Sequence, residues 1–285
     1  MKTEKKDSAK IIVTTHKKYR MPKDPLYLPL QVGAGVEKKG VKTPSLGYAC
    51  DDTGANISKK NPLFCELTGL YWAWKNLDAE YIGLVHYRRY FGRDRYAYRK
   101  HLPQWVRLHS PWTKILKSED VERLMEKYRI LVPAKRRYYI ETLYSHYEHT
   151  HFVHHLHVTR GIISKLCPEY LTVYDRVLKQ TSGYMFNMMV MDRALLDDYC
   201  SWLFPILFAL EQKIDVTELS YYQGRYCGRV GEIIFNVWLS YQLESGRLAR
   251  NEVLQLPYIY MEKVDWIKKV KSFLLAKFLH KRYEQ

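Results

Sequence analysis

Short apolar runs alternate along the chain with longer segments whose apolar residues recur every three or four positions. Four of the runs have no polar face and consist mainly of β-branched or large apolar residues, and they lie at 11–15, 81–85, 130–133 and 184–191. Continuous apolar runs of this length are typical of strands that are buried on both faces of a sheet. The pattern therefore predicts four buried strands.

Segments with helical periodicity separate these runs. A helix is expected over 63–76, because apolar residues recur there at helical spacing and Pro62 suits a first helical turn. Further helices are expected from Ser118, across most of 140–178, from Asp192 to Leu210, and over 231–243. Strands that alternate with helices favour an α/β sandwich with a largely parallel central sheet.

Polar residues follow two of the predicted strands directly. His16 lies in the loop after the first strand, and the segment His86–Tyr90 follows the second. Ligands of parallel sheets bind beyond the carboxyl ends of the strands, so we expect these residues to share one rim. Arg88 and Arg89 would meet an anionic group there, because a guanidinium matches the oxygens of a phosphate. The alternative is an exposed strand end whose arginines pair with nearby carboxylates.

Composition narrows the class of protein. The 285 residues include 46 Lys and Arg against 30 Asp and Glu, which gives a formal net charge of +16. An apolar content of 47% supports one sizeable core and argues against intrinsic disorder. The excess positive charge indicates an anionic partner, which could be a nucleic acid, a membrane surface or a phosphorylated small molecule.

Five widely spaced cysteines without a CxxC pair argue against a disulfide framework and favour a reducing compartment. No apolar run reaches the roughly 18–20 residues that span a bilayer. The polar segment Met1–Lys10 has no apolar run behind it and so does not resemble a secretory signal. We therefore expect a cytoplasmic protein.

Several side chains could carry chemistry. Six of the eleven histidines lie between 146 and 157, but no carboxylate or cysteine spacing completes a metal-ligand set, so we expect no metal site there and keep His149 as a polar candidate. Asp52 lies in a turn-rich loop and is a better site candidate than the acidic pair Asp197–Asp198. Glu232 is expected in the first turn of a helix, where it is either a partner of the helix dipole or a general base. No Walker, GxGxxG or GxSxG pattern occurs.

Several stretches of the sequence together resemble a known bacterial family. They are Asp52–Ser58, Asn61–Asn76, Tyr81–Phe91, Phe186–Met188, Tyr199–Phe204 and Gly231–Glu232. The family was first catalogued as a domain of unknown function, carries an HYRRYF signature, occurs in capsule and exopolysaccharide gene clusters, and is now grouped with glycosyltransferases. Some of its members transfer galactofuranose. The resemblance covers roughly residues 10–243, and the HYRRYF segment is its most specific part.

The resemblance implies a GT-A-like fold that binds a nucleotide-diphospho-sugar. GT-A enzymes end one strand with an Asp-x-Asp motif that holds a divalent cation, whereas the comparable strand here ends in His86-Tyr87-Arg88. Cationic side chains would then neutralise the leaving diphosphate, so no cofactor is strictly required, although Mn²⁺ or Mg²⁺ could still bind.

The resemblance also assigns roles to individual residues. Glu232 is the expected catalytic base of an inverting transfer. The acceptor-binding candidates are His149, Asn187 and Arg229. The donor-binding candidates are His16, Asp52, Asn56, Ser58, Glu66, His86, Tyr87, Arg88 and Arg89.

The C-terminal segment differs in character from the rest. From Val264 to Arg282, apolar residues recur at helical spacing between many lysines, as in a basic amphipathic helix on an anionic membrane surface. A helix that closes the core or packs on a partner chain is the alternative. We therefore predict a transferase domain over 1–250 and a basic helical tail over 251–285.

These expectations combine into one function. The chain is expected to transfer a sugar, such as galactose or galactofuranose, from a UDP-sugar to a lipid-linked oligosaccharide in capsule, exopolysaccharide or O-antigen synthesis. It would act on the inner face of the cell membrane and bind no nucleic acid. The alternative is a nucleic-acid-binding protein with a basic, aromatic surface, although no RRM, KH, zinc-finger or helix-turn-helix pattern is present.

Overall fold

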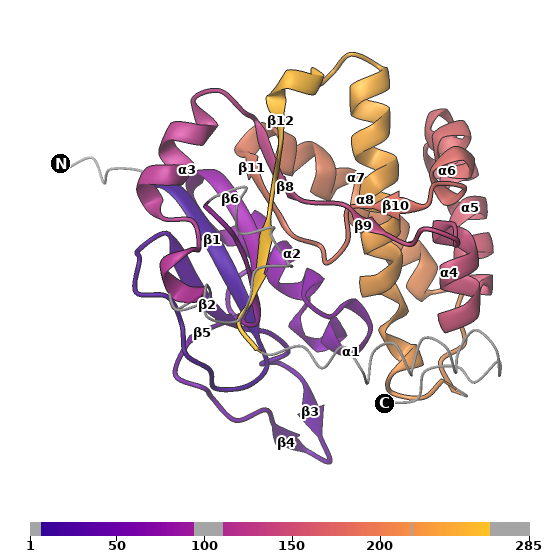
Figure 1. The fold of residues 1–285 in the computed structure, drawn as a ribbon. Helices are drawn as coiled ribbons and strands as arrows, with labels where there is room; N and C mark the ends of the chain where they lie inside the picture. The colour runs from indigo at the N-terminus through magenta and orange to yellow at the C-terminus, as the bar shows by residue number, and fades with distance from the viewer. Residues whose placement is uncertain (1–6, 94–110, 218, 263–285) are drawn as a thin grey trace.

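The computed structural model of the chain describes residues 7–93, 111–217 and 219–262 (Figure 1). Its centre is a nine-stranded mixed sheet with helices on both faces. The strands are β1 (Asp7–Thr15), β2 (Tyr27–Gln31), β3 (Glu37–Lys38), β4 (Val41–Lys42), β5 (Ala49–Cys50), β6 (Ala79–His86), β7 (Arg89–Phe91), β8 (Ile130–Pro133), β9 (Arg136–Arg137), β10 (Ser182–Gly183), β11 (Met189–Asp192), β12 (Val253–Leu256) and β13 (Tyr258–Tyr260).

The strand order of the central sheet is β12-β8-β11-β6-β1-β2-β5. Along this path only β11 is antiparallel to its neighbours, so β12, β8, β6, β1, β2 and β5 all run in one direction. β7 and β13 extend the sheet from the end of β6 as an antiparallel pair. The largely parallel sheet predicted from the sequence is therefore confirmed.

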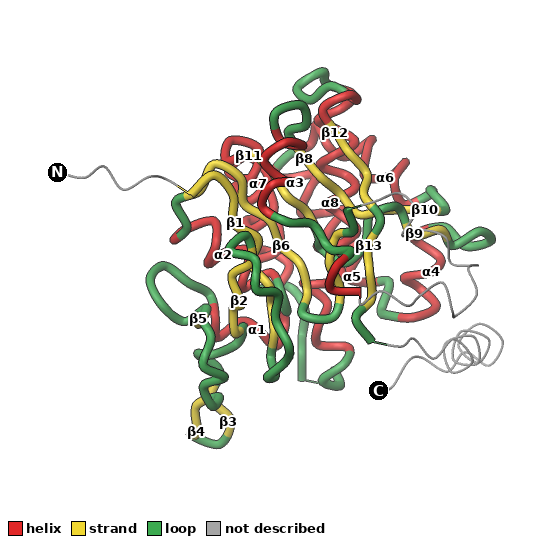
Figure 2. Tube along the Cα trace, turned by 60° about the vertical axis from the view of Figure 1, so that its left-hand side comes forward, coloured by secondary structure: helices red, strands yellow, loops and turns green. Residues whose placement is uncertain are grey.

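Helices cover the sheet unequally. The α-helices are α1 (Asn61–Phe64), α2 (Leu67–Asn76), α3 (Ser118–Met125), α4 (Leu143–Thr150), α5 (His154–Leu166), α6 (Leu171–Leu178), α7 (Arg193–Glu211) and α8 (Tyr226–Glu244), and the 3₁₀ helices are η1 (Ser58–Lys60), η4 (Pro111–Thr113), η5 (Pro168–Tyr170), η6 (Gln223–Arg225) and η7 (Arg250–Glu252). α2 and α7 pack on one face of the sheet and α3 on the other, while α5, α6 and α8 form a further layer behind α7 (Figures 1 and 2). The short β3–β4 hairpin projects from the body of the molecule (Figure 2).

Burial on both faces explains why the strands read as continuous apolar runs. In β1, Ile12 packs into the core under α2 and α7, whereas Ile11 and Val13 pack into the core under α3. β8 shows the same alternation, with Leu131 on the opposite face from its neighbours. Each side chain therefore loses its water on one side or the other, which favours apolar residues at every position.

A predicted strand and a predicted helix are each interrupted in the structure by a change of backbone direction. The strand expected over 184–191 is shorter, because only β11 pairs in the sheet and the backbone before it turns through Phe186 (φ 81°) and Asn187 (φ 50°). The helix expected over 63–76 is interrupted at Cys65 (φ 53°), which separates α1 from α2. An apolar run records burial but not a change of backbone direction, so periodicity gave no sign of either break.

The segment assigned to the tail begins inside the sheet. β12 pairs with β8 in parallel, and β13 pairs with β7, so residues 253–260 belong to the central sheet. The amphipathic helix predicted over 264–282 lies outside the described residues and stays a prediction. Among the helices that the structure describes, none has an apolar stretch long enough to cross a bilayer.

Candidate functional site at the carboxyl edge of the sheet

The parallel strands end at one edge of the sheet. The loops that follow β1, β2, β5, β6 and β8 begin at this edge. The antiparallel strand β11 starts there. The N-terminal half of α8 lies against this region, because Asn187 at the start of β11 donates to the carbonyl of Gly228 at 3.0 Å. Most of the residues singled out from the sequence therefore meet at one rim.

Asn187 joins three separate elements at this rim. Its Nδ2 donates to Oε1 of Glu66 at 2.6 Å and to the backbone oxygen of Gly228, so it links the α1–α2 junction, the start of β11 and α8. The side chain is 2% exposed. Its Oδ1 has no hydrogen-bond partner among the described residues. Asn187 is thus held on one side and keeps a free acceptor on the other.

The backbone around this contact is strained. Cys65, Phe186 and Asn187 all have positive φ, although none of them is glycine. Such residues cost free energy and persist only where the surrounding structure imposes them, which is common at functional sites. Here Cys65 directly precedes Glu66, Phe186 directly precedes Asn187, and Asn187 itself donates the hydrogen bond to Glu66.

Glu232 is a half-buried carboxylate beside this pair. α8 begins at Tyr226, so Glu232 lies in its second turn and not in the first turn as expected. Its carboxylate has no hydrogen bond or ion pair within the described ranges. Burial raises the pKa of Glu232 to about 7, and the negative charge of Glu66 adds to this effect, while Arg89 and other nearby arginines oppose it. A carboxyl group that titrates near neutral pH can act as a proton acceptor.

Arg89 supplies positive charge on the β7 side of Glu232. Its guanidinium lies over the rings of Phe186 (3.7 Å) and Tyr260 (4.8 Å), and its Nε is buried without a partner among the described residues. His86 contributes no such charge, because burial lowers its pKa and the neutral ring donates from Nε2 to the backbone oxygen of Phe186 at 2.5 Å. His86 therefore fixes the strained turn before β11.

Three cationic side chains and a histidine surround the end of β1, and we call His16, Lys17, Arg88 and Arg225 the β1 basic cluster. Burial lowers the pKa of His16, and the charges of Arg88 and Arg225 lower it further, which shows that these side chains are close. The ring of Tyr87 contacts that of His16 edge to face at 5.5 Å. Glu262 lies 3.3 Å from Arg88 and 3.9 Å from Lys17, and Arg225 donates to Sγ of Cys65 at 3.1 Å. The cluster is mostly exposed and rich in hydrogen-bond donors.

The loops after β2 and β5 are held by Asp51 rather than by the predicted Asp52. The fully buried carboxylate of Asp51 accepts from the amides of Gly33 (3.0 Å) and Ala34 (3.1 Å), and also from the hydroxyls of Ser58 and Thr68. Asp52 is exposed on the rim.

Ser58 and Asn56 have structural partners in the same loop. The hydroxyl of Ser58 accepts from Gly35 and donates to Asp51, and Oδ1 of Asn56 accepts from the amide of Ser58. These hydrogen bonds are internal to the loop, and donor binding by Asp52, Asn56 and Ser58 stays a prediction.

The two histidines of α4, His146 and His149, are held by hydrogen bonds to Glu141, which was not among the residues predicted from the sequence. Glu141, 3% exposed, accepts from Nδ1 of His146 and Nδ1 of His149, both at 2.8 Å. Although burial by itself raises the pKa of Glu141, these two hydrogen bonds lower it overall. Nε2 is consequently the ring nitrogen through which the predicted acceptor residue His149 could reach a ligand.

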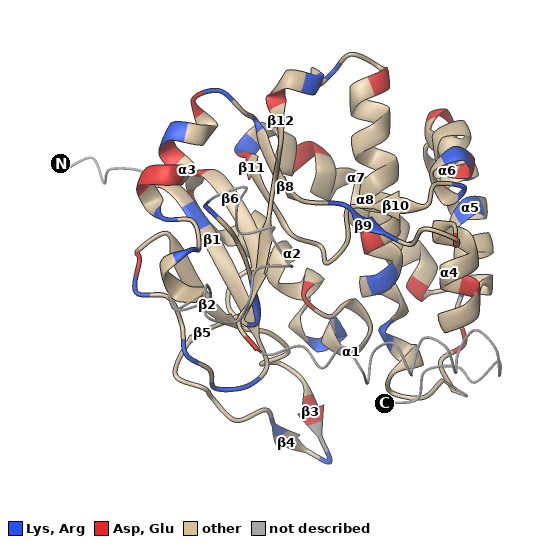
Figure 3. Cartoon of the chain, in the orientation of Figure 1, with Lys and Arg blue, Asp and Glu red and all other residues tan. Residues whose placement is uncertain are grey.

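Arg136 and Arg229 complete the positive surroundings of Glu232. Figure 3 shows the basic segment around β9 beside α8. Arg229 is half-buried, and its Nη2 donates to the backbone oxygen of Tyr222 at 2.6 Å. Arg136 was not among the sequence candidates, although it closely follows the strand 130–133 and the rule that identified His86 would have found it. Arg225 carried no comparable signal, because the loop before α8 has no recognisable pattern.

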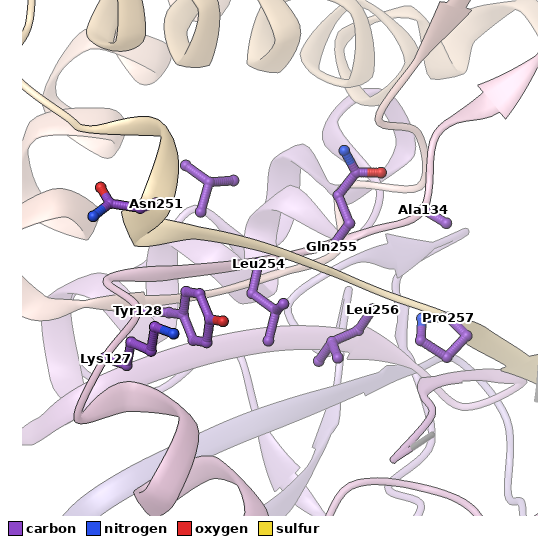
Figure 4. Close-up of a pocket in the computed structure, with 9 residues that line it drawn as sticks. Lys127, Tyr128, Ala134, Asn251, Leu254, Gln255, Leu256 and Pro257 are labelled. Atoms are coloured by element: carbon purple, nitrogen blue, oxygen red, sulfur yellow. The ribbon is translucent and has the colours of Figure 1, made fainter. Parts of the chain in front are cut away.

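Metal ligands and a cavity are the two other features that bear on a binding site. Within residues 7–93, 111–217 and 219–262, no group of three or more His, Cys, Asp or Glu side chains could hold a metal ion. A cavity of about 560 Å³ lies beside β12 (Figure 4). Its lining consists of Lys127, Tyr128, Ala134, Asn251, Val253, Leu254, Gln255, Leu256 and Pro257. Because no candidate residue contributes to it, this cavity is separate from the rim described above.

Comparisons with known proteins agree with this architecture. The structure is similar to the apo structure of WbbM, a bifunctional glycosyltransferase, with a TM-score of 0.76 and 29% sequence identity. The match covers 90% of this chain and 46% of the other, so the chain spans about half the length of that protein. No protein with a curated description matches the sequence. The model of the family described as a domain of unknown function, DUF4422, matches residues 10–243, and the chain therefore belongs to that family.

Proposed function

We propose that the protein is a glycosyltransferase that moves a sugar from a nucleotide-diphosphate donor to a hydroxyl group of an acceptor. The observation that carries the proposal is Glu232, a half-buried carboxylate with a pKa of about 7 in a ring of arginines at the carboxyl edge of the sheet. Similarity to the WbbM structure over 90% of the chain supports the same activity.

In the proposed reaction, Glu232 removes the proton from the acceptor hydroxyl as its oxygen attacks the anomeric carbon of the donor. A new C–O bond forms, and the bond between the anomeric carbon and the diphosphate oxygen breaks. The diphosphate leaves with the electron pair of that bond. Attack from the face opposite the leaving group inverts the anomeric configuration.

The β1 basic cluster is the proposed binding site for the diphosphate of the donor. Arg88 and Arg225 offer guanidinium groups that match phosphate oxygens, and Tyr87 offers a ring beside them. Fixed cations stabilise the charge that develops on the leaving diphosphate. A divalent cation would then be dispensable in the reaction.

The sequence resemblance supports a finer form of the proposal. The donor would be a UDP-sugar, such as UDP-galactose or UDP-galactofuranose, and the acceptor a lipid-linked saccharide of capsule, exopolysaccharide or O-antigen synthesis. The basic segment 264–285 would hold the protein on the inner face of the membrane.

A panel of nucleotide sugars tests the proposal. UDP and at least one UDP-sugar are expected to raise the Tm of the protein, because a ligand that binds only the folded state stabilises it. Slow release of UDP from that sugar donor is expected to persist in excess EDTA.

Each arm of this experiment can contradict a separate statement. Complete loss of turnover in EDTA would contradict the metal-independent form of the reaction. If no nucleotide sugar bound, while an oligonucleotide bound with a steep dependence on salt, the chain would be a nucleic-acid-binding protein instead.

The pH dependence of transfer is expected to report Glu232. The base must be ionised, so the rate should rise with pH and level off above about 7. Because the negative charge of Glu66 raises the pKa of Glu232 in the free protein, Glu66→Gln should move the acid limb of the kcat/KM profile to lower pH. The matched control is Glu80→Gln, at an exposed position in the first half of β6. An acid limb that did not move in Glu66→Gln would contradict the coupling.

A further inference from the structure

Two neighbouring apolar side chains, Tyr139 and Ile140, lie on the surface just after β9, and we call this pair the apolar tip. They are 81% and 72% exposed. In the part of the chain that the structure describes, the other exposed large apolar residues have no such neighbour in sequence, and these are Val41, Leu166, Val216 and Tyr221. Single exposed apolar residues are common, whereas contiguous exposed apolar surface marks sites of interaction.

Buried residues hold the apolar tip from both sides. The amide of Tyr138 donates to the carbonyl of Thr181 at 2.8 Å, and the two residues before it pair with β10. Tyr138 is 8% exposed, and its ring contacts that of His146 at 4.2 Å. On the other side, Glu141 is 3% exposed and accepts hydrogen bonds from His146 and His149. The two residues between these anchors are therefore kept at the surface.

The backbone of the tip is strained. The amide of Ile140 donates to the carbonyl of Tyr138 at 2.7 Å, which closes a three-residue turn around Tyr139. Tyr139 has a φ of 60°, a conformation that costs free energy in a residue other than glycine. Within the described residues, neither apolar side chain gains burial in return. Strain of this kind is common where a segment contacts a ligand or another surface.

Positive charge accompanies the tip. Arg136 and Arg137, the two residues of β9, are both exposed, and neither forms an ion pair with a carboxylate of residues 7–93, 111–217 or 219–262. The guanidinium of Arg136 lies over the ring of Tyr138 at 4.9 Å. Lys135 precedes them, and its ammonium lies 4.9 Å from the ring of Tyr184. Two exposed apolar side chains therefore follow a run of three cations.

These features together match the surface of an anionic bilayer. Arginines meet lipid phosphates, tyrosine rings lie at the level of the headgroups, and an aliphatic side chain enters the acyl boundary. A protein partner is a poorer match, because stable protein interfaces cover about 800 Å² on each side and the tip offers only two apolar side chains. A nucleic acid would use the arginines and stack on Tyr139, but it has no place for Ile140.

The tip lies beside the candidate site. Arg136 is one of the arginines whose charge acts on Glu232, and Figure 3 shows this basic segment next to α8. Burial raises the pKa of Tyr138 to about 12, Arg136 opposes this shift, and the charge of Glu232 adds to it. A membrane that meets the tip would therefore face the side of the molecule that carries Glu232.

We propose that the apolar tip, together with Arg136 and Arg137, is a membrane-contact surface that inserts Tyr139 and Ile140 into the headgroup region of an anionic bilayer. The contact belongs to the described body of the protein and is separate from the one predicted for segment 264–285. It turns the candidate site towards a substrate that is held in the membrane. This last consequence rests on the proposed sugar transfer, whereas the contact itself does not.

Binding of the full-length chain to lipid vesicles tests this surface. The vesicles contain phosphatidylglycerol and phosphatidylcholine in equal parts, and co-sedimentation over a range of lipid concentrations measures the affinity. The wild type is expected to bind. The double variant Tyr139→Asn/Ile140→Ser should bind about tenfold more weakly, because it removes the apolar groups while asparagine tolerates the positive φ. Arg137→Gln should weaken binding about fivefold, since each basic residue near an anionic surface adds to the attraction.

Leu166→Ser is the matched control. Leu166 is 56% exposed and follows Lys165 at the end of α5, so an apolar side chain next to a cation is removed from a different element. Its vesicle binding should equal that of the wild type. Every variant retains segment 264–285, so a difference between them reports the tip. The Tm and its increase with UDP should stay at wild-type values, because all the replaced side chains are exposed.

The outcomes separate this inference from the proposed function. If the double variant bound the vesicles as tightly as the wild type, or if the wild type did not bind them, the membrane-contact proposal would be wrong, whatever the result with nucleotide sugars. If vesicle binding depends on the tip but no nucleotide sugar binds, the transferase proposal fails while the membrane contact remains.

Discussion

Replacing Glu232 by Gln is expected to lower kcat for sugar transfer by about 10²–10⁴-fold, the usual contribution of a general base. The amide has nearly the same shape as the carboxyl group but cannot accept the proton of the acceptor hydroxyl. The Kd for UDP should not change, because the β1 basic cluster and not Glu232 is proposed to hold the diphosphate. Single-turnover transfer and UDP titration measure the two quantities separately.

The same variant has a readout that does not depend on activity. The pKa of Glu232 is raised from 4.5 to about 7, so ionising this group in the folded protein costs stability, and the cost grows as the pH rises through that interval. The Tm of Glu232→Gln, measured relative to that of the wild type, should therefore increase as the pH is raised from 5 to about 8. A difference that stayed constant with pH would mean that the carboxylate is not desolvated.

Glu244→Gln is the matched control for this substitution. Glu244 is the last residue of α8 and pairs with Arg176 at the surface, so the same chemical change occurs on the same helix without touching the site. Because exposed ion pairs contribute only about 0–1 kcal/mol, both kcat and Tm should remain close to wild type. If kcat in Glu232→Gln stayed within about threefold of the control, Glu232 would not be the base.

Replacing Asp51 by Ala is expected to destabilise the fold by about 3 kcal/mol or more. The change leaves the buried amides of Gly33 and Ala34 without their acceptor, at about 1–3 kcal/mol each, and also removes partners of Ser58 and Thr68. For a chain of this length the Tm should fall by roughly 6–12 °C. Thermal unfolding followed by circular dichroism measures the change.

The neighbouring Asp52 provides the comparison. It is exposed and has no hydrogen bond within the described residues, so Asp52→Ala should change stability by no more than about 0.5 kcal/mol. Equal Tm values for the two variants would show that the Asp51 hydrogen bonds do not hold these loops. If Asp52 binds the donor as predicted, Asp52→Ala should weaken the binding of the UDP-sugar while leaving the Tm of the free protein unchanged.

The sequence predicted the sheet well because burial of both faces leaves a direct trace in the chain. Ile11–Thr15 consists entirely of β-branched residues and Ile130–Pro133 is apolar throughout, and both lie in strands of the central sheet. Asp192 was expected to cap a helix, and its side chain accepts from the amide of Leu195 at the start of α7. Such features depend on a few consecutive residues and can therefore be read locally.

The short strands were harder to predict. β12 and β13 lie in a segment that we assigned to the tail, because Val253–Tyr260 is short and its partly exposed residues interrupt any apolar run. Their place in the sheet depends on pairing with β8 and β7, which are distant in sequence. Pairing between distant segments leaves little trace in a short, partly exposed strand.

By itself, the sequence determined the fold class, and it predicted a candidate site at the carboxyl edge of the sheet with most of the charged residues that lie there, because strand ends and arginines can be recognised from neighbouring residues. Only the tertiary structure decided which of these groups act together. It brought Glu66, Asn187 and Glu232 into one group through backbone turns at Cys65 and Phe186, and it buried Asp51 while leaving Asp52 exposed. Desolvation and hydrogen bonding depend on what packs around a side chain, and this is fixed only when distant segments of the chain meet.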